Sequence, residues 1–419
     1  MVSMRQESDE RHLPHAVYWI AVVAFALRLG ARLCAGIAGY FDSGYRFFFD
    51  LAQSIAAGRG LAVEAPTAFR VPLYPIFLAV LTLGHKGAVW PVILAQSAIG
   101  AATCLCASLL AHMIFEGPDK AKAALIAGGI TAIYPYYVVH DTALQETSLF
   151  TLLTLAVVLL LWRTALGGDL RLAALSGVLL GLDILTRATV APFAVFAVLW
   201  LLWRRRFMQG LLCALLLGST VTPWLWRSYR LTGSPVLSTE TGLQLWKGNN
   251  GFLFHHYPEQ DSDLSEYEAM NSLSLQEQSE LNQLSGNEEL QDRWFRQRAL
   301  GEMRTHPWRT VRDDVRKLIA VFGWLPVARH GRLANLMHAI SYGPVMLLGL
   351  WGMWLRRDHW RDDSLIYGLF LAFALVAAVF YGDTSHRSYL DVYWIVFVGG
   401  LLARLYRGAS ESSSPRVRS

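Results

Sequence analysis

The chain has 419 residues, of which 54% are hydrophobic and only 16% are charged. Soluble domains usually contain about a quarter of charged residues, so this composition indicates a membrane protein. The net charge of +5 is small for this length, and no basic, weakly hydrophobic domain stands out, so we expect no nucleic-acid binding. Cys34, Cys104, Cys106 and Cys213 all lie inside apolar runs. We therefore expect buried thiols and neither a disulfide framework nor a zinc site.

Ten apolar runs predict membrane-spanning helices, and several are shorter than the roughly 20 residues that a crossing needs. They are residues 16–39, 91–115, 123–138, 144–162, 172–186, 189–203, 209–226, 334–355, 364–381 and 388–406. The first run contains Arg28 and Arg32 and no small-residue cleavage site, so it predicts a retained first span and not a signal peptide. The shorter run 72–84 opens with Pro72-Leu73-Tyr74-Pro75 and ends at Gly84. It predicts an interfacial or re-entrant helix.

The basic residues of the short loops predict the orientation of these spans. They are Lys120, Lys122, Arg163, Arg171, Arg204, Arg205, Arg206, Arg356, Arg357 and Arg361. All fall on one side of the membrane if 72–84 does not cross, and positively charged short loops stay in the cytoplasm. We therefore expect a multi-pass protein of the plasma (inner) membrane, with both termini in the cytoplasm and two large loops outside.

This topology predicts an all-α polytopic fold with four parts. Residues 1–226 form an N-terminal transmembrane catalytic module, whose first external loop at 40–90 carries interfacial helices. Residues 227–333 form a large external loop. Residues 334–407 contain the C-terminal transmembrane helices, and residues 408–419 are a disordered cytoplasmic tail.

The large external loop is predicted to change character along its length. Its first part, through Ser285, is rich in Ser, Gln, Asn and Glu and is expected to be loop-like. Residues 287–322 predict helix that is broken at Pro307. One apolar stripe follows that break, and it consists of Val311, Val315, Leu318, Ile319 and Phe322. Basic residues on the other side are Arg309, Arg312, Arg316 and Lys317, so this segment predicts an amphipathic helix on the outer leaflet.

Ionisable residues near the external ends of the spans are the main functional signal. They are Asp42, Asp50, Asp141, Glu146, Arg187, Arg227, His386 and Arg387. Charges at membrane depth are costly and usually mark function, so their convergence predicts a cavity at the outer surface. Arginine binds phosphate through paired, charge-assisted hydrogen bonds and can stabilise a departing lipid phosphate without a metal. A carboxylate beside an acceptor hydroxyl can act as a general base.

Several of these polar residues also have a structural interpretation. Arg28 and Arg32 are one helical turn apart and more often snorkel or form structural pairs. Asp141 at a span end is equally suited to a helix cap. Asp183, inside its span, is more often a packing residue. The pair His255-His256 has no obvious third ligand, so we expect no metal site.

An ordered set of short motifs runs along most of the chain. The motifs are Phe41-Asp42-Ser43-Gly44-Tyr45, the stretch from Asp50 to Gly60, Ala68-Phe69-Arg70-Val71-Pro72-Leu73-Tyr74-Pro75, Gln96 with Gly100, Leu185-Thr186-Arg187, Pro223-Trp224-Leu225-Trp226-Arg227, Gly242, Lys247-Gly248-Asn249-Asn250, His306-Pro307 and His386-Arg387-Ser388-Tyr389. Together they resemble the protein O-mannosyltransferase and lipid A aminoarabinose transferase group. That group (glycosyltransferase families 39 and 83) belongs to the GT-C class of membrane glycosyltransferases.

The resemblance implies a GT-C-type bundle that transfers a sugar from a polyprenyl-phosphate donor on the non-cytoplasmic face. The reaction would invert the configuration at the anomeric carbon of the sugar. It would need no nucleotide sugar, cofactor or metal. A first-loop aspartate would be the base, best matched by Asp42, and arginines at Arg187, Arg227 and Arg387 would bind the lipid phosphate. With the charged residues above, the expected substrate-binding set is Arg70, Tyr74, Gln96, Glu146, Arg187, Arg227, Asn249, His386 and Arg387. The expected partners are the donor, membrane lipids and a glycan, lipid or protein acceptor.

The sequence departs from the family pattern in three places. Asp42 stands ten residues before Ala52, a loose spacing that keeps Asp50 as a candidate for the base, and Asp141 is a third candidate. Val71 replaces a proline in the Arg70 motif. The first external loop contains no Asp-Glu doublet of the kind that marks protein mannosyltransferases, which disfavours a protein acceptor.

Two other functions stay open at this point. An undecaprenyl-linked polysaccharide polymerase or ligase would also use a large external loop, with a diphosphate-linked oligomeric donor. A lipid-linked sugar transporter or flippase should instead show paired halves with broken helices near the membrane midplane. The sequence shows no such halves, and its charges collect at one surface.

Overall fold

The computed structural model describes residues 13–42, 45–260, 262–325 and 331–413, and within them the chain forms helices and connecting segments with no strand. The bundle helices are α2 (Ala16–Ala35), α5 (Val89–Ile114), α6 (Asp119–Ile133), α7 (Pro135–Thr142), α8 (Thr147–Gly167), α9 (Leu170–Thr186), α10 (Ala191–Trp203), α11 (Phe207–Thr232), α17 (Arg332–Leu355), α18 (Trp360–Val379) and α20 (Asp391–Ser413). Short turns of helix are η1 (Tyr40–Asp42), η2 (Ala188–Val190), η3 (Arg357–His359), α19 (Thr384–Arg387) and η4 (Ser388–Leu390). The predicted all-α polytopic fold is confirmed.

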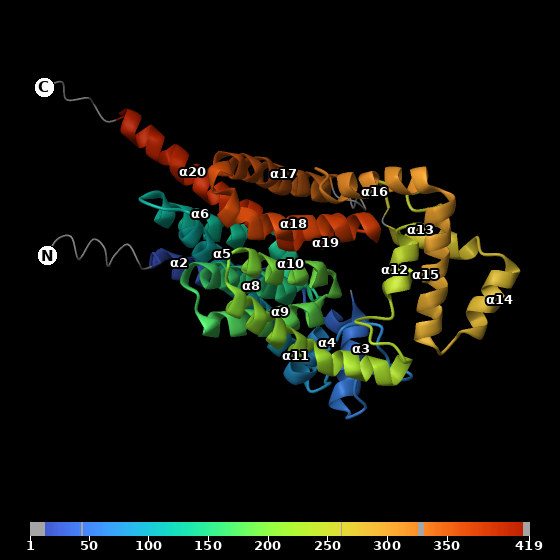
Figure 1. Cartoon of the computed structure of the whole chain (residues 1–419). Coiled ribbons are helices and arrows are strands. Elements are labelled where there is room, and N and C mark those ends of the chain that lie inside the picture. Colours follow the sequence, from blue (N-terminus) through green and yellow to red (C-terminus); the bar gives the residue numbers. More distant parts are fainter. Residues whose placement is uncertain (1–12, 43–44, 261, 326–330, 414–419) are drawn as a thin grey trace, which may run out of the picture.

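Seven helices in the described part of the chain are long and apolar enough to cross a membrane, and the bent pair α6 and α7 would be an eighth. Helices α9 and α10 have only 17 and 13 residues, so the predicted count of ten crossings stays a prediction. Figure 1 shows the start of α2 and the end of α20 at the same end of the bundle. The predicted count of ten, an even number, agrees with that arrangement.

The predicted span 123–138 is not one straight helix. The chain bends by 53° between α6 and α7. Pro135 begins α7, and it disfavours helical geometry at Tyr134, whose φ of −63° and ψ of 118° are extended. The bend makes α7 a separate short helix, which carries Asp141.

The first external loop contains the two short helices that were predicted there, α3 (Arg46–Ala56) and α4 (Leu73–Thr82). Helix α4 has 10 residues. A helix of that size is about 15 Å long, too short to cross a bilayer. It packs against α3 and buries Tyr74 and Leu78. The first loop is therefore a folded layer against the end of the bundle that is predicted to face outward, and we call this end the outer end.

The prediction that the large external loop is loop-like through Ser285 is wrong. Helix α11 continues to Thr232, and α12 (Thr241–Lys247), α13 (Ser262–Asn271) and α14 (Leu275–Gln283) follow it. Ser274 and Glu277 form a capping box that begins α14. A small core joins these helices to α15 (Glu288–Thr305), and it includes Trp246 and Phe295. The polar composition covers solvent-facing sides of short helices.

The predicted break at Pro307 is present, because α16 (Pro307–Val321) begins there. Its apolar residues Val311, Val315 and Ile319 are exposed, together with Trp308, which is 85% exposed. Lys317, predicted for the polar side, is buried. The contact of the exposed stripe with the outer leaflet stays a prediction.

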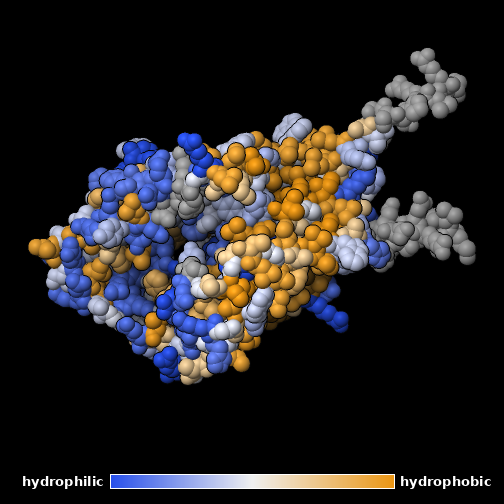
Figure 2. Space-filling view, turned by 180° about the vertical axis from the view of Figure 1, so that it is seen from behind, coloured by the Kyte–Doolittle hydropathy of each residue, from blue (hydrophilic) through white to orange (hydrophobic). Residues whose placement is uncertain are grey.

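Part of the predicted disordered tail is helical, because α20 continues to Ser413. The rest of that tail, residues 414–419, lies outside the described residues. Figure 2 shows hydrophobic side chains gathered over the bundle and hydrophilic side chains over the end that carries α12 to α15.

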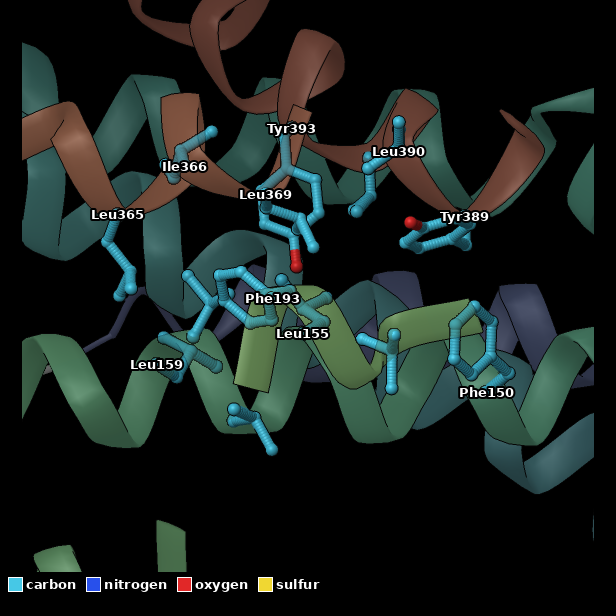
Figure 3. Packing of buried hydrophobic residues seen from close by; sticks show 14 of the residues in the cluster. Phe150, Leu155, Leu159, Phe193, Leu365, Ile366, Leu369, Tyr389, Leu390 and Tyr393 are labelled. Carbon is cyan, nitrogen blue, oxygen red and sulfur yellow. The ribbon is translucent and has the colours of Figure 1, made fainter. Parts of the chain in front are cut away.

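The bundle core fixes the outer ends of α8 and α9. Figure 3 shows side chains of α8, α10, α18, η4 and α20 packed against one another, including Phe150, Phe193, Leu369 and Tyr389. Dense packing of this kind makes a core rigid. Residues that directly precede α8 or follow α9 are therefore held in fixed positions.

Candidate active site

The first arginine–carboxylate pair of the site joins Arg187 to Glu146. Arg187 directly follows α9, and Glu146 directly precedes α8. The guanidinium donates from Nε and Nη2 to Oε1 of Glu146 at 3.1 and 2.8 Å. It also lies over the ring of Phe150, 5.3 Å from the ring centre. Among the described residues, Oε2 of Glu146 is buried and has no hydrogen-bond partner.

The second pair joins the first external loop to the large one. Nη1 of Arg70 lies 2.7 Å from Oε2 of Glu240, the residue directly before α12. Gln244 donates to Oε1 of Glu240 at 2.6 Å. The guanidinium of Arg70 lies near the rings of Phe48 and Phe69, at 5.9 and 5.6 Å. Glu240 is buried, whereas a third of the Arg70 side chain is exposed.

The two carboxyl groups shift their pKa values in opposite directions. Burial alone would raise the pKa of Glu146, but the guanidinium of Arg187, with help from Arg70, outweighs it and lowers that pKa. Burial raises the pKa of Glu240, and Arg70 and Lys247 offset the rise only in part. Arg70 thus acts on both carboxyls. The charges alternate in the order Arg187, Glu146, Arg70, Glu240 and Lys247, and we call these five residues the charged array.

Lys247 and His386 lie at the edge of the charged array. Lys247 ends α12, and its Nζ forms ion pairs with Asp263 and, at 2.9 Å, with Glu266. His386 lies in α19 and interacts electrostatically with Glu146, Arg187 and Lys247. Backbone N–H groups of this helix, including that of His386 at 3.3 Å, donate to Asp383. Charged residues at the ends of α8 and α9 and Lys247 of α12 therefore all lie within electrostatic range of His386 in α19.

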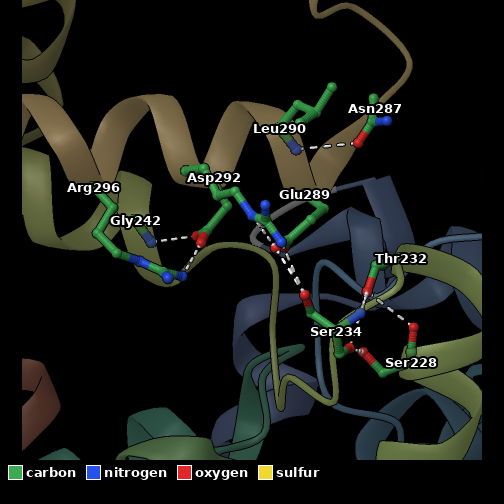
Figure 4. Close-up of polar contacts among 10 residues, drawn as sticks. Ser228, Thr232, Ser234, Gly242, Asn287, Glu289, Leu290, Asp292 and Arg296 are labelled. Carbon is green, nitrogen blue, oxygen red and sulfur yellow. Dashed lines mark hydrogen bonds and ion pairs between the residues drawn. The ribbon is translucent and has the colours of Figure 1, made fainter.

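Helix α12 is fixed in place by α15. The backbone N–H of Gly242 donates to Asp292 of α15, and a side chain at Gly242 would collide with the Asp292 carbonyl oxygen, 2.0 Å from its Cβ. Next to it, Glu289 accepts from Ser234 at 3.0 Å, and Figure 4 shows both contacts. Glu288 accepts from the Ala68 N–H and from Thr239 at 3.0 and 2.8 Å. Carboxylates of α15 therefore fix the chain next to both Glu240 and Arg70.

The structure brings together four of the predicted site residues, namely Arg70, Glu146, Arg187 and His386. The three aspartates predicted as bases lie elsewhere, each paired with a cation. Asp42 is exposed and lies 3.2 Å from Lys86. Asp50 lies 3.5 Å from Arg46, one turn away on α3. Asp141 lies 2.5 Å from Arg28 inside the bundle, as a structural pair would.

Tyr74 and Gln96 fasten the first loop to the bundle. The hydroxyl groups of Tyr74 and Tyr40 both donate to Oε1 of Gln96 at 3.2 Å. Nε2 of Gln96 donates to the Ala143 carbonyl at 2.8 Å. These contacts position the layer that carries Arg70.

Arg227 also binds the first loop. Its Nη1 and Nη2 donate to the carbonyl oxygens of Thr67 and Leu61, each at 2.9 Å, and its guanidinium lies 5.1 Å from the Trp224 ring centre. In the described structure this side chain therefore contacts backbone beside Arg70. Its predicted binding of lipid phosphate stays a prediction.

The last two predicted site residues, Asn249 and Arg387, lie near the junction of α12, α16 and α18. Nδ2 of Asn249 donates to the Val379 carbonyl at 2.8 Å. Lys317 of α16 donates to the Gly248 and Phe380 carbonyls at 3.1 and 3.5 Å. We call this junction the Lys317 anchor.

Arg387 is fully buried close to that anchor. It donates to the Val321 carbonyl at 2.8 Å and lies 3.3 Å from Asp391. Its contacts are those of a structural residue in this state of the protein.

Sequence reasoning missed Glu240, the carboxylate of the second pair. It lay in the segment read as loop-like. The run Ser238-Thr239-Glu240-Thr241 before apolar residues is a helix-start signal and could have drawn attention to it. Within the described residues, no group of three or more His, Cys, Asp or Glu side chains could bind a metal ion.

A family model described as dolichyl-phosphate-mannose-protein mannosyltransferase matches residues 70–226, which include Arg70, Glu146 and Arg187. The apo structure of the Archaeoglobus fulgidus oligosaccharyltransferase aligns with 97% of this chain, at 12% identity and a TM-score of 0.55. This chain has the GT-C fold. The resemblance predicted from the sequence is therefore confirmed at the level of the class.

The GT-C fold is seen again in the A. fulgidus oligosaccharyltransferase AglB in complex with an inhibitory peptide and a dolichol-phosphate, with 96% of this chain aligned, 12% identity and a TM-score of 0.52. This GT-C chain spans about half the length of those two structures, 53% and 52%. ArnT from Cupriavidus metallidurans bound to undecaprenyl phosphate aligns with 93% of this chain and 81% of its own, at 12% identity and a TM-score of 0.41. No curated protein matches the sequence.

Proposed function

We propose that this GT-C protein transfers a sugar from a polyprenyl-phosphate donor to an acceptor hydroxyl. The observation that carries the proposal is the Arg187–Glu146 pair beside Arg70 at the outer end of an apolar bundle. Arg187 uses Nε and Nη2 for Glu146, so its described contacts leave Nη1 available to an anion. Arginine suits a phosphate because its N–H groups bind two oxygens at once.

The donor class follows from the position of the site as well as from its charge. A phosphate that carries a long apolar chain can stay in the bilayer while its head group reaches the charged array. The AglB structure contains a dolichol-phosphate, a lipid phosphate of this kind. The acceptor oxygen would attack the anomeric carbon from the face opposite the phosphate, which inverts that carbon. Arginines would stabilise the charge on the departing phosphate without a metal.

The proposed setting is the plasma (inner) membrane, with both termini in the cytoplasm and the charged array on the non-cytoplasmic face. The acceptor would be a lipid, a polysaccharide or a protein. The layer formed by α12 to α15 carries Glu240 and Lys247, so an acceptor would contact this layer.

The test is sugar transfer or slow hydrolysis in proteoliposomes supplied with a panel of radiolabelled polyprenyl-monophosphate sugars. We expect turnover of one donor, its loss in Arg187→Ala, and its retention in Arg230→Ala, a matched change at an exposed arginine of α11. Sugar movement across the bilayer without any turnover would overturn the proposal in favour of a flippase. Turnover only of diphosphate-linked oligosaccharides would favour a polymerase or ligase.

A further inference from the structure

The charged array contains two carboxylates, and they differ in how they are held. Oε1 of Glu146 accepts two hydrogen bonds from Arg187 of the bundle. In the proposed function, Arg187 also binds the phosphate of the sugar donor. Glu240 comes from the external layer, and its only described cationic contact within 4 Å is Arg70. Arg70 is a third exposed and interacts with both carboxylates. A phosphate that draws Arg70 toward itself would therefore free Oε2 of Glu240.

We propose that Glu240 is the general base of the transfer, with Arg70 as the residue that releases it when the donor phosphate binds. This inference rests on the function proposed above. The acceptor hydroxyl oxygen forms a bond to the anomeric carbon as the bond from that carbon to the phosphate oxygen breaks. The electron pair of the broken bond leaves with the polyprenyl phosphate, and the hydroxyl proton moves to Oε2 of Glu240. Atoms and charges balance without a further reactant.

The position of Glu240 supports this role. Gln244 donates to Oε1 at 2.6 Å, which leaves Oε2 as the oxygen that exchanges Arg70 for a proton. The contacts of Gly242 with Asp292 and of Thr239 with Glu288 fix the backbone on both sides of Glu240. Acceptors that approach from outside the membrane reach this layer before the bundle.

The charges that face Glu240 also suit a base. They are Arg70 from the first loop, Lys247 from its own helix and Glu146 from the segment before α8. Burial raises the pKa of Glu240 above its ordinary value, whereas the pKa of Glu146 is lowered. A carboxylate is a more effective proton acceptor when its pKa lies nearer the working pH. Carboxyl groups with diverging pKa values often divide such roles in enzymes.

The test compares Glu240→Gln with wild type in proteoliposomes, with the polyprenyl-monophosphate sugar that wild type turns over and with water as acceptor. We expect kcat to fall by about 10²- to 10⁴-fold, the usual contribution of a general base. The donor KM should stay within about two-fold, because the phosphate contacts are kept. Sodium azide should restore turnover and yield a glycosyl azide, since azide has no proton to lose.

Two further variants separate this role from others. Glu64→Gln, a matched change at an exposed first-loop carboxylate, should behave as wild type. Glu146→Gln should raise the donor KM and show no recovery with azide. Glu240→Asp, which keeps a carboxylate, should recover part of the lost kcat.

Three results would overturn the inference. Glu240→Gln that keeps kcat within a few-fold of wild type would exclude Glu240 as the base. A Glu240→Gln variant that unfolds at lower temperature and gains nothing from azide would show a structural role. Wild type that turns over no donor would overturn the proposed function and this inference together, whereas the first two results leave that function standing.

Discussion

Two buried arginine–carboxylate pairs look alike in the sequence and differ in the structure. Arg28 lies 2.5 Å from Asp141, its Nη1 donates to the Ala24 and Ala132 carbonyls at 3.1 Å, and its side chain is fully enclosed. The side chain of Arg187 keeps 17% of its surface exposed beside the other members of the charged array. A ligand can therefore reach Arg187 but not Arg28. Access, and not the presence of buried charge, separates the candidate site from a structural pair.

Gly100 explains why the enclosed pair fits in the bundle. A Cβ at this position would lie 2.1 Å from Nε of Arg28 and 2.2 Å from Oδ2 of Asp141. Glycine leaves the space that the pair fills. Gln96 lies one turn before Gly100 on the same face of α5, where it accepts from Tyr74 and Tyr40, so the motif packs the first loop and the enclosed pair against one side of this helix.

The largest effect that would sharpen this comparison is expected for Glu146→Gln. The change leaves the buried Arg187 without its counter-charge, so we expect donor kcat/KM to fall at least about 10²-fold, which is about 2.7 kcal/mol in transition-state binding. The pKa of Glu146 is lowered in the folded protein, so its stabilising contribution is full above the ordinary pKa of glutamate and is lost as the pH falls through its folded pKa.

Two measurements check the Glu146 prediction. Donor kinetics in proteoliposomes give kcat/KM, and thermal unfolding in detergent between neutral and acidic pH gives stability. Glu146→Gln should show a shallower loss of stability toward acid than wild type. Lower stability with unchanged kinetics would place this pair in the same structural class as Arg28 and Asp141.

For the enclosed pair of Arg28 and Asp141 we expect a substitution to lower the stability of the fold and to leave turnover unchanged. Asp141→Asn leaves Arg28 unpaired, and breaking a buried pair costs about 3–5 kcal/mol. Gly100→Ala should lower the unfolding temperature as well, because the new methyl group displaces both partners. Turnover per folded molecule, measured after size-exclusion chromatography, should stay near that of wild type. A specific loss of turnover in well-folded Asp141→Asn would return this aspartate to the catalytic candidates.

Arg227→Ala tests the contact of Arg227 with the first loop, for which we expect an intermediate effect on donor kinetics. The variant loses two hydrogen bonds to first-loop carbonyls, each worth about 1 kcal/mol. We expect the donor KM to rise about 10-fold through displacement of Arg70, with a smaller change in kcat. Protease cleavage between Leu61 and Thr67 should become faster. A large loss of kcat with an intact loop would instead favour direct phosphate binding by Arg227.

The smallest effect is expected for Asp42→Asn. Its exposed pair with Lys86 contributes at most about 1 kcal/mol, so stability and donor turnover should both stay close to wild type. Lys86→Ala serves as the matched control for the same contact. Abolished turnover in Asp42→Asn alone would return the base to the position that the family resemblance implies and would contradict the assignment to Glu240.

The sequence predicted the all-α, multi-pass bundle because the length of an apolar run follows directly from the thickness of a bilayer. It missed the bend before Pro135 because hydropathy does not report chain direction. It missed α12 to α14 because short helices with a small shared core show little periodicity. Glu240 was missed for the same reason.

The site was predicted in part, since Arg70, Glu146 and Arg187 converge as expected. Arg227, Asn249 and Arg387 show where such reasoning ends. Their residue types suit a phosphate or a sugar, but each donates to a backbone carbonyl, and Arg387 also pairs with Asp391. A sequence gives the hydrogen-bonding capacity of a side chain and not the atoms that occupy it.

The Lys317 anchor gives the external layer a second fixed point. Glu288 ties one end of that layer to the first loop, and Lys317 ties the other to Phe380 at the end of α18. Helices α13 and α14 form an excursion between Gly248, whose carbonyl accepts from Lys317, and Glu288, and Glu240 lies outside it. Under the function proposed above, the sequence of this excursion can change which acceptors bind without changing the donor site, provided that the ion pairs of Lys247 with Asp263 and Glu266 are kept.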